Sequence, residues 1–196
     1  MRLSGARRRL GYPRLASGLL LSQSVQTPSR PHRAEHWRNL AAQLDWKLEI
    51  PPPAPRPGRQ LVIHTGAGQT VREWPRERFD ALAAHLRGAG WQVTLIDNSL
   101  TDLDRLLEIL AGADRFIGND SGPGHLAALL GVPTFTLFGP QLPERFAPQH
   151  PQAAWIDGAP CAHKPCHDYC RFAVPHCLRD VPLETVRQRV DAWLRA

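Results

Sequence analysis

The sequence has 196 residues and 42% hydrophobic residues, which suits one globular domain, or one domain with an appendage. The net charge of +6 is unevenly distributed. Residues 1–59 hold eleven Lys or Arg against three acids, a balance of +8, whereas the rest holds 13 against 15, a balance of −2. The basic character therefore belongs to the first segment and not to the remainder of the chain.

The first segment contains an arginine run, Arg7–Arg9, and an apolar run, Leu15–Leu21. The apolar run is too short to span a bilayer. Pro13 and Arg14 separate it from the basic run, and no clean small-x-small cleavage site follows, so it makes a poor signal peptide. The arginines indicate a solvated tail, a nucleic-acid arm or a membrane-surface contact. We expect a cytoplasmic protein and leave open a contact with the inner face of a membrane.

A helix is predicted over residues 36–44, where apolar residues recur at helical spacing and form one face. These residues are Trp37, Leu40, Ala41 and Leu44. The segment Pro51–Pro57 is rich in proline, which predicts a stiff connector over residues 51–59.

Beyond the connector, short apolar strands alternate with amphipathic helices. The predicted strands are 60–64, 91–96, 115–117 and 133–138; the predicted helices are 76–87, one from Thr101 to Leu110, one after Ser121, and 182–194. Such alternation predicts an α/β fold with a Rossmann-like parallel sheet, whose ligands bind beyond the carboxyl ends of the strands. The chain after Pro140 is predicted to be irregular up to the last helix.

The turn between the third predicted strand and its helix contains residue types that favour a helix start. Asn119, Asp120 and Ser121 are N-cap residue types, and Pro123 suits a first helical turn. A helix N-terminus at the end of a strand presents free amides and partial positive charge, which suits a phosphate or diphosphate, and His125 lies one turn further on. A well-capped turn with no ligand remains the alternative.

Two further features follow the first predicted strand. Thr65–Gly68 is a glycine-rich turn, which by itself is a weak signal for phosphate binding. Arg72, taken without its neighbours, is best interpreted as a surface charge. Asp97, after the second strand, suits either a ribose hydroxyl or a turn.

All four cysteines fall in one short stretch, interleaved with three histidines; they are Cys161, Cys166, Cys170 and Cys177. In a reducing compartment, a cluster of this density favours a metal site over disulfides. Tetrahedral thiolate ligation would suit zinc or iron. The spacing is not the paired CxxC of a zinc ribbon, so free thiols or a disulfide stay open.

The segment Asn119–His125, followed by Leu126–Thr134 and Phe138-Gly-Pro140, resembles the nucleotide-sugar signature of the heptosyltransferases, glycosyltransferase family 9. The stretches His64-Thr-Gly-Ala67 and Arg72-Glu-Trp-Pro75 are similar to the family's His-x-Gly-Ala and Lys-x-Trp-Pro. Here Arg72 stands in place of the phosphate-binding lysine. The resemblance covers residues 60–195 well and residues 7–50 loosely.

This resemblance implies the C-terminal half of a two-domain GT-B glycosyltransferase, with a Cys-rich loop that some members share. Residues 1–50 would be a remnant of the acceptor domain, 51–59 the linker and 60–196 the nucleotide-sugar domain. The implied reaction transfers heptose from ADP-heptose to a lipopolysaccharide core or related glycan acceptor, with inversion and no cofactor for chemistry. No catalytic residue is assigned, because the family's general base lies at the start of the first domain, which we expect to be missing.

In the family, Asp120 would hold sugar hydroxyls, while Arg72, His125 and the amides of the turn would bind the diphosphate. The full set expected to contact the donor is Thr65, Gly66, Arg72, Asp120, Ser121, Gly122, Gly124 and His125. Two other classes remain open: a non-catalytic fragment that binds a nucleotide sugar, and a Cys-rich nucleic-acid-binding protein. The second is disfavoured, because no aromatic residues interleave the arginine run to stack on bases.

Overall fold

The computed structural model describes residues 5–29, 32–48 and 56–196. The chain divides into two compact units, residues 1–50 and 51–196. Most of the predicted proline-rich connector lies outside the described residues, and the proposed domain boundaries stay a prediction.

The first unit has little regular structure. Strand β1 (Leu10–Gly11) pairs in parallel with β2 (Gln23–Ser24), and the 3₁₀ helix η2 (Leu15–Leu20) connects them. Helix α1 (Arg33–Ala42) follows and contains most of the predicted helix. The predicted apolar face of this helix is only partly covered: Ala41 is buried, but Trp37 is 61% exposed. A unit of this size has few elements against which a helix face can pack.

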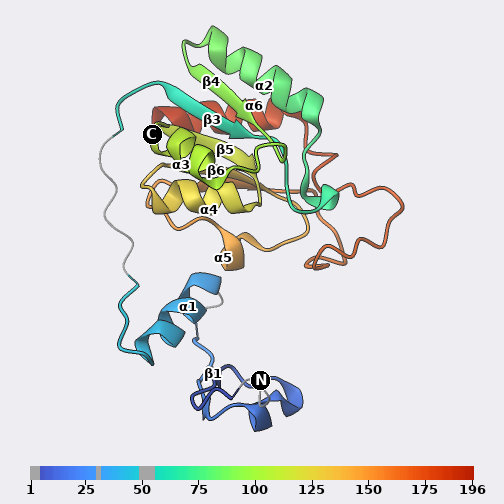
Figure 1. The fold of residues 1–196 in the computed structure, drawn as a ribbon. Helices are drawn as coiled ribbons and strands as arrows, with labels where there is room; N and C mark the ends of the chain where they lie inside the picture. Colours follow the sequence, from blue (N-terminus) through green and yellow to red (C-terminus); the bar gives the residue numbers. More distant parts are fainter. Residues whose placement is uncertain (1–4, 30–31, 49–55) are drawn as a thin grey trace. The chain divides into compact units, whose positions relative to one another are not determined.

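The second unit is built on a sheet of five parallel strands in the order β4-β3-β5-β6-β7 (Figure 1). The strands are β3 (Gln60–His64), β4 (Gln92–Ile96), β5 (Arg115–Asn119), β6 (Thr134–Phe138) and β7 (Ala154–Asp157). The helices are α2 (Arg76–Gly88), α3 (Leu103–Ala111), α4 (Gly122–Leu129), α5 (Pro143–Phe146) and α6 (Leu183–Arg195), with the 3₁₀ helix η3 (Thr70–Arg72) after β3. The predicted α/β fold with a parallel sheet is confirmed.

Helices cover both faces of this sheet, with α2 and α6 on one face and α3 and α4 on the other (Figure 1). Successive side chains of a strand point to opposite faces, so each inner strand contributes to both layers. In β3, Leu61 and Ile63 pack in the layer under α2 and α6, whereas Val62 packs toward α3 and α4. This two-sided burial explains why the strands have continuous apolar sequences.

Strand β7 and helix α5 lie in the stretch that was predicted to be irregular. They were missed because Ala154–Asp157 is a four-residue strand at the sheet edge and Pro143–Phe146 is a single helical turn. Neither is long enough to show a hydrophobic period.

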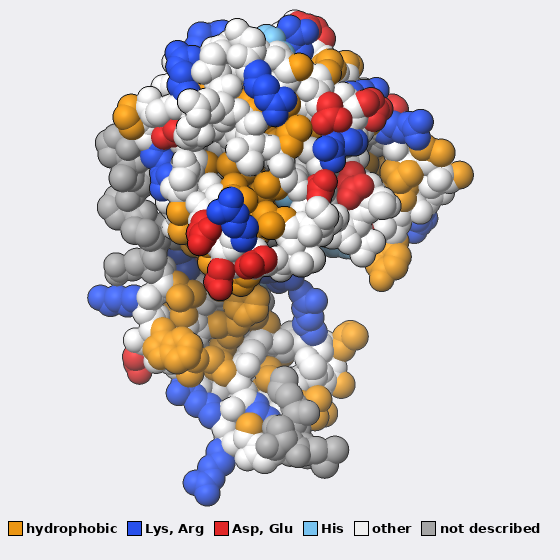
Figure 2. Space-filling view, turned by 45° about the horizontal axis from the view of Figure 1, so that its top comes forward, with side chains coloured by type: hydrophobic (Ala, Val, Ile, Leu, Met, Phe, Trp, Pro, Cys, Tyr) orange, Lys and Arg blue, Asp and Glu red, His pale blue; other side chains and the backbone are white. Residues whose placement is uncertain are grey.

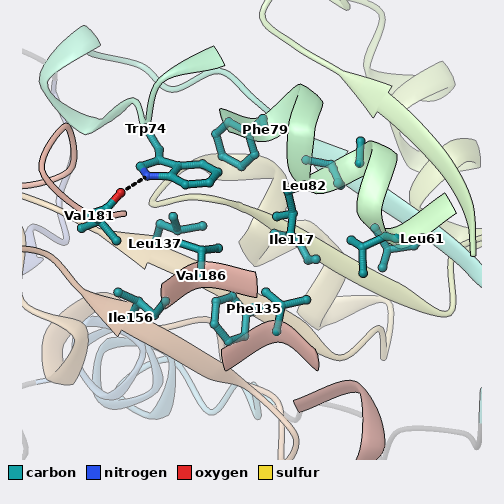
Figure 3. Packing of buried hydrophobic residues seen from close by; sticks show 14 of the residues in the cluster. Leu61, Trp74, Phe79, Leu82, Ile117, Phe135, Leu137, Ile156, Val181 and Val186 are labelled. Atoms are coloured by element: carbon teal, nitrogen blue, oxygen red, sulfur yellow. Dashed lines mark hydrogen bonds between the residues drawn. The ribbon is translucent and has the colours of Figure 1, made fainter. Parts of the chain in front are cut away.

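Trp74 is the largest side chain in the layer beneath α2. It is 1% exposed, and its ring meets Phe79 edge-on with centroids 4.9 Å apart. Its indole Nε1 donates a hydrogen bond of 2.9 Å to the carbonyl oxygen of Val181, just before α6 (Figure 3). Trp74 therefore ties the segment after β3 to the C-terminal helix.

Replacing Trp74 by alanine should lower the free energy of unfolding by about 3–5 kcal/mol, because it leaves a large cavity. Trp74→Phe should cost less, since the Val181 carbonyl also accepts a hydrogen bond from Arg78. Chemical denaturation measures both. Trp155→Ala is the control, since Trp155 is 41% exposed and its loss should cost less than about 1 kcal/mol. Equal losses for Trp74→Ala and Trp155→Ala would contradict the assigned packing.

Candidate functional site

The turn between β5 and α4 forms the centre of the candidate site. Ser121 is the N-cap residue of α4, but its side chain makes no capping hydrogen bond. Its hydroxyl lies 3.2 Å from Nδ1 of His64 instead. Amides in the first turn of a helix have no carbonyl partner within the helix, and Pro123 carries no amide hydrogen. The amides of Gly122 and Gly124 are therefore available to an external acceptor.

Asn119 fixes this turn to the segment after β3. Its side chain is completely buried, and its Oδ1 accepts a hydrogen bond of 3.0 Å from the backbone amide of Trp74. Its Nδ2 donates to the carbonyl oxygens of Thr65, at 2.9 Å, and Gly66, at 3.2 Å. One amide side chain thus joins the end of β5 to both ends of the 65–74 segment.

A hollow of about 210 Å³ lies beside the start of α4, where it is lined by His64, Gly68, Ser121, Gly122 and Asn98 among others. A Cβ on Gly68 or on Gly122 would meet no atom within 4 Å, so both backbones face open space. Both backbones can therefore be approached closely, as a phosphate-binding turn requires.

Arg72, at the end of η3, extends toward the same turn. Its Nη1 lies 3.4 Å from Oδ2 of Asp120. Its Nε and Nη2 make hydrogen bonds of 2.7 and 2.5 Å to the two carboxylate oxygens of Asp168. This hydrogen bonding raises the pKa of Arg72, so the guanidinium stays charged.

The carboxyl group of Asp120 lies in a poorly solvated position. Its side chain is 5% exposed, and burial raises its pKa to about 6, although Arg72 acts in the opposite direction. Burial also lowers the pKa of His64. Both shifts are typical of groups held away from water beside a functional site.

Thr65 and Gly66, which were also predicted from the sequence to contact the donor, lie beside a different hollow. Thr65 and Gly66 line a larger hollow of about 620 Å³, together with Arg76 and Asp97. The hydroxyl of Thr65 donates to the carbonyl oxygen of Ile96 at 3.4 Å and so takes part in the fold. A Cβ on Gly66 would come within 2.3 Å of Asn98, so the close approach of these segments requires glycine.

Asp97 forms a turn. Its Oδ1 accepts hydrogen bonds from the amide and the hydroxyl of Ser99, at 2.9 and 2.6 Å, and its Oδ2 lies 3.2 Å from Nη1 of Arg76. The turn interpretation accounts for these contacts. His125 is half-buried on α4, one turn from Ser121.

The four cysteines line one small hollow beside Gly139 and Pro140, with Lys164 and His176. Their thiols are free, and only Cys177 is buried. Within residues 5–29, 32–48 and 56–196, no group of three or more His, Cys, Asp or Glu side chains is arranged to hold a metal ion. The fold thus brings the thiols to one place without forming a coordination shell.

The fold and this site define a parallel α/β domain in which helix α4 starts without a side-chain cap, near an arginine. Residues 98–173 match glycosyltransferase family 9 (heptosyltransferase). Lipopolysaccharide heptosyltransferase 1 of Pseudomonas aeruginosa is 30% identical over 149 residues, which cover 57% of this chain and 41% of that protein. Residues 98–173 and the 30% identity to this relative make the chain similar to glycosyltransferase family 9.

Solved structures share the fold. The family 9 glycosyltransferase of Veillonella parvula has a TM-score of 0.73 and 17% identity, with 97% of this chain and 68% of that chain covered. The iron-containing dodecameric heptosyltransferase TibC, solved with ADP-D-beta-D-heptose, has a TM-score of 0.61 and 18% identity, with 81% and 52% covered. The chain spans about two fifths of the length of the curated relatives that it matches.

Sequence reasoning missed three residues that shape the site. Asn119 and His64 stand inside the recognised motifs, but their roles depend on burial, which the motifs do not show. Asp168 lies 96 positions after Arg72, and no local pattern links the two.

The burial of Asp120 predicts a dependence of stability on pH. Its pKa of about 6 in the folded protein exceeds the value of about 3.9 for an unfolded aspartate, so between these pH values the folded state holds a proton that the unfolded chain has lost. Stability therefore falls as the pH rises from about 4 to 6. Asp120→Asn should remove this fall and raise the free energy of unfolding at pH 7 by about 1–3 kcal/mol.

Denaturant titrations at pH 4.5, 6 and 7.5 measure this effect. Asp180→Asn is the matched control, because Asp180 is exposed, and the variant should keep the slope of the wild type. A less stable Asp120→Asn protein with an unchanged slope would mean that the contact with Arg72 outweighs the cost of burial.

Proposed function

We propose that this chain binds the diphosphate of a nucleotide-sugar donor, ADP-heptose, and serves heptosyl transfer to a lipopolysaccharide core or related glycan acceptor. The observation that carries the proposal is the uncapped start of α4 with Arg72 beside it. Free amides and a permanent cation together suit a diphosphate. The names of the relatives support the choice of heptose and of the acceptor.

In this proposal the chain stabilises the leaving group. The bond between the anomeric carbon and the diphosphate breaks, and the acceptor oxygen bonds to that carbon from the opposite face. The amides of Gly122 and Gly124, with Arg72 and His125, would stabilise the negative charge that develops on the departing diphosphate. Asp120 would accept hydrogen bonds from sugar hydroxyls. The acceptor proton would pass to a general base, a role that we assign to no residue of this chain.

Two other functions predict different behaviour. A non-catalytic domain would bind the donor without turnover. A nucleic-acid-binding protein would need a basic surface, but on the face seen in Figure 2 acidic and basic side chains are interspersed over the larger unit. The donor site is therefore favoured over nucleic acid.

The cysteines provide donors that fit a structural metal. Four thiols line one hollow, and thiolates suit zinc or iron. TibC, which shares the fold, is iron-containing. Cys161, Cys166, Cys170 and Cys177 would hold such an ion and stabilise the loop that carries them, with no part in the chemical step.

The place of action is proposed to be the cytoplasmic side of the inner membrane, where the lipid-linked acceptor would be met. Among the described residues, no helix is both long and apolar enough to span a bilayer. Leu15 and Leu19 of η2 are exposed, and arginines precede them, so a peripheral contact of the first unit with anionic lipid is part of the proposal.

Calorimetric titration with ADP and ADP-heptose tests the donor site. The wild-type protein should bind both, and Arg72→Ala and His125→Ala should each weaken binding by about 1.5–3 kcal/mol, the value of a charge-assisted contact. Arg105→Ala is the control, since Arg105 is exposed on α3 and pairs there with Glu108. If Arg72→Ala and Arg105→Ala change the affinity by the same amount, the diphosphate site is wrongly placed.

Elemental analysis of the reduced, purified protein tests the metal. We expect near-stoichiometric zinc or iron, and loss of the ion in Cys166→Ser, because a thiolate ligand is removed. Absence of metal, together with four titratable thiols in the folded protein, would exclude the site.

A further inference from the structure

The Cys-rich segment 161–177 places one carboxylate on the arginine that the proposed donor needs. Asp168 meets the Nε and Nη2 edge of Arg72 with both oxygens, at 2.7 and 2.5 Å. Both side chains are mostly buried, with 25% and 21% of their surface exposed. A bidentate arginine–carboxylate pair in this setting has the geometry that a phosphate group would adopt on the same edge.

The charge of Arg72 is thereby already compensated. Asp168 takes one edge of the guanidinium, and Asp120 lies 3.4 Å from its Nη1. Two carboxylates beside one cation leave little attraction for a further anion, and they repel a diphosphate that approaches the start of α4. The described arrangement therefore opposes the binding of the ligand for which the helix terminus is suited.

A tight turn of the segment presents Asp168 to Arg72. His167 and Asp168 have φ angles of 51° and 71°, in the left-handed region that residues other than glycine seldom adopt. The buried Gln141 adds a long contact, 3.4 Å from its Nε2 to Oδ1 of Asp168. The backbone amide of Tyr169 donates a hydrogen bond of 3.0 Å to the carbonyl oxygen of Cys166 and closes this turn. The ion pair with Arg72 is an additional side-chain contact of the turn.

We propose that Asp168 is an autoinhibitory stand-in for the donor diphosphate, which must displace its carboxylate from Arg72 in order to bind. The inference rests on the proposed function of the α4 terminus and adds a regulatory element to it. Segment 161–177 then acts as a strap with two states. In the closed state, Asp168 neutralises the charge of Arg72. In the open state, the guanidinium is available to the phosphates.

The test is the dissociation constant of ADP, measured calorimetrically with the full chain at fixed ionic strength. Asp168→Asn should bind ADP about tenfold more tightly than wild type, because the ligand no longer competes with a charged contact. Asp180→Asn removes the same charge from an exposed position nearby in sequence and should change the affinity less than about twofold. Asp168→Glu keeps the charge and should not reproduce the gain.

A double variant separates competition at Arg72 from general repulsion. In the Arg72→Ala background, Asp168→Asn should give no gain, since the contested contact is gone. A gain of equal size in that background would overturn the inference. If wild type binds ADP and Arg72→Ala weakens it, but Asp168→Asn binds equally or more weakly, Asp168 positions Arg72 instead, and only the inference fails.

The two remaining outcomes are also decisive. Binding of ADP by Asp168→Asn but not by wild type at millimolar concentration would support the inference in its strongest form. If none of these variants binds ADP, both the inference and the proposed donor site are overturned.

Discussion

The arrangement of the site depends on the buried side chain of Asn119. A primary amide in a dry interior must satisfy both its oxygen and its nitrogen, and here the partners are backbone groups at the two ends of the 65–74 segment, which follows β3. The end of β5 and the 65–74 segment therefore cannot move independently. Because α4 begins three residues later and η3 lies within that segment, this constraint sets the positions of the Gly122 amide and of Arg72.

Around this fixed frame, the charges are closely balanced. Burial disfavours the charged form of Asp120 and so raises its pKa. Arg72 contacts both Asp120 and Asp168. Ionisable groups with shifted pKa values of this kind cluster at functional sites. In the proposed reaction, the start of α4 and Arg72 serve the leaving group, while the strap determines how readily the guanidinium becomes available.

Much of the fold was predictable from the sequence, because periodic apolar patterns mark elements with a buried face. The predicted bounds of β3 match the structure, and α2, α3 and α6 differ by one or two residues at their ends. Short elements such as α5 and β7 have no such period. In the predicted apolar face of α1, Ala41 is buried but Trp37 is exposed, because periodicity shows that a face could be buried and not whether anything covers each of its residues.

The site was predictable only as far as its motifs are local. The β5–α4 turn and Arg72 were recognised from neighbouring residues, and the structure brings Arg72 to Asp120. The contact of Arg72 with Asp168 joins two segments far apart in the chain, and the roles of His64 and Asn119 depend on burial. The four thiols were expected near one another from their spacing, and they line one hollow. Among the described residues they are not arranged to hold a metal ion.

A crystal structure of this chain grown with ADP tests the central claim most directly. The account predicts diphosphate oxygens within hydrogen-bond distance of the Gly122 or Gly124 amide and of the Arg72 guanidinium, with the Asp168 carboxylate moved off Arg72. ADP bound elsewhere, for instance in the larger hollow beside Arg76, with the Arg72–Asp168 pair intact, would contradict it.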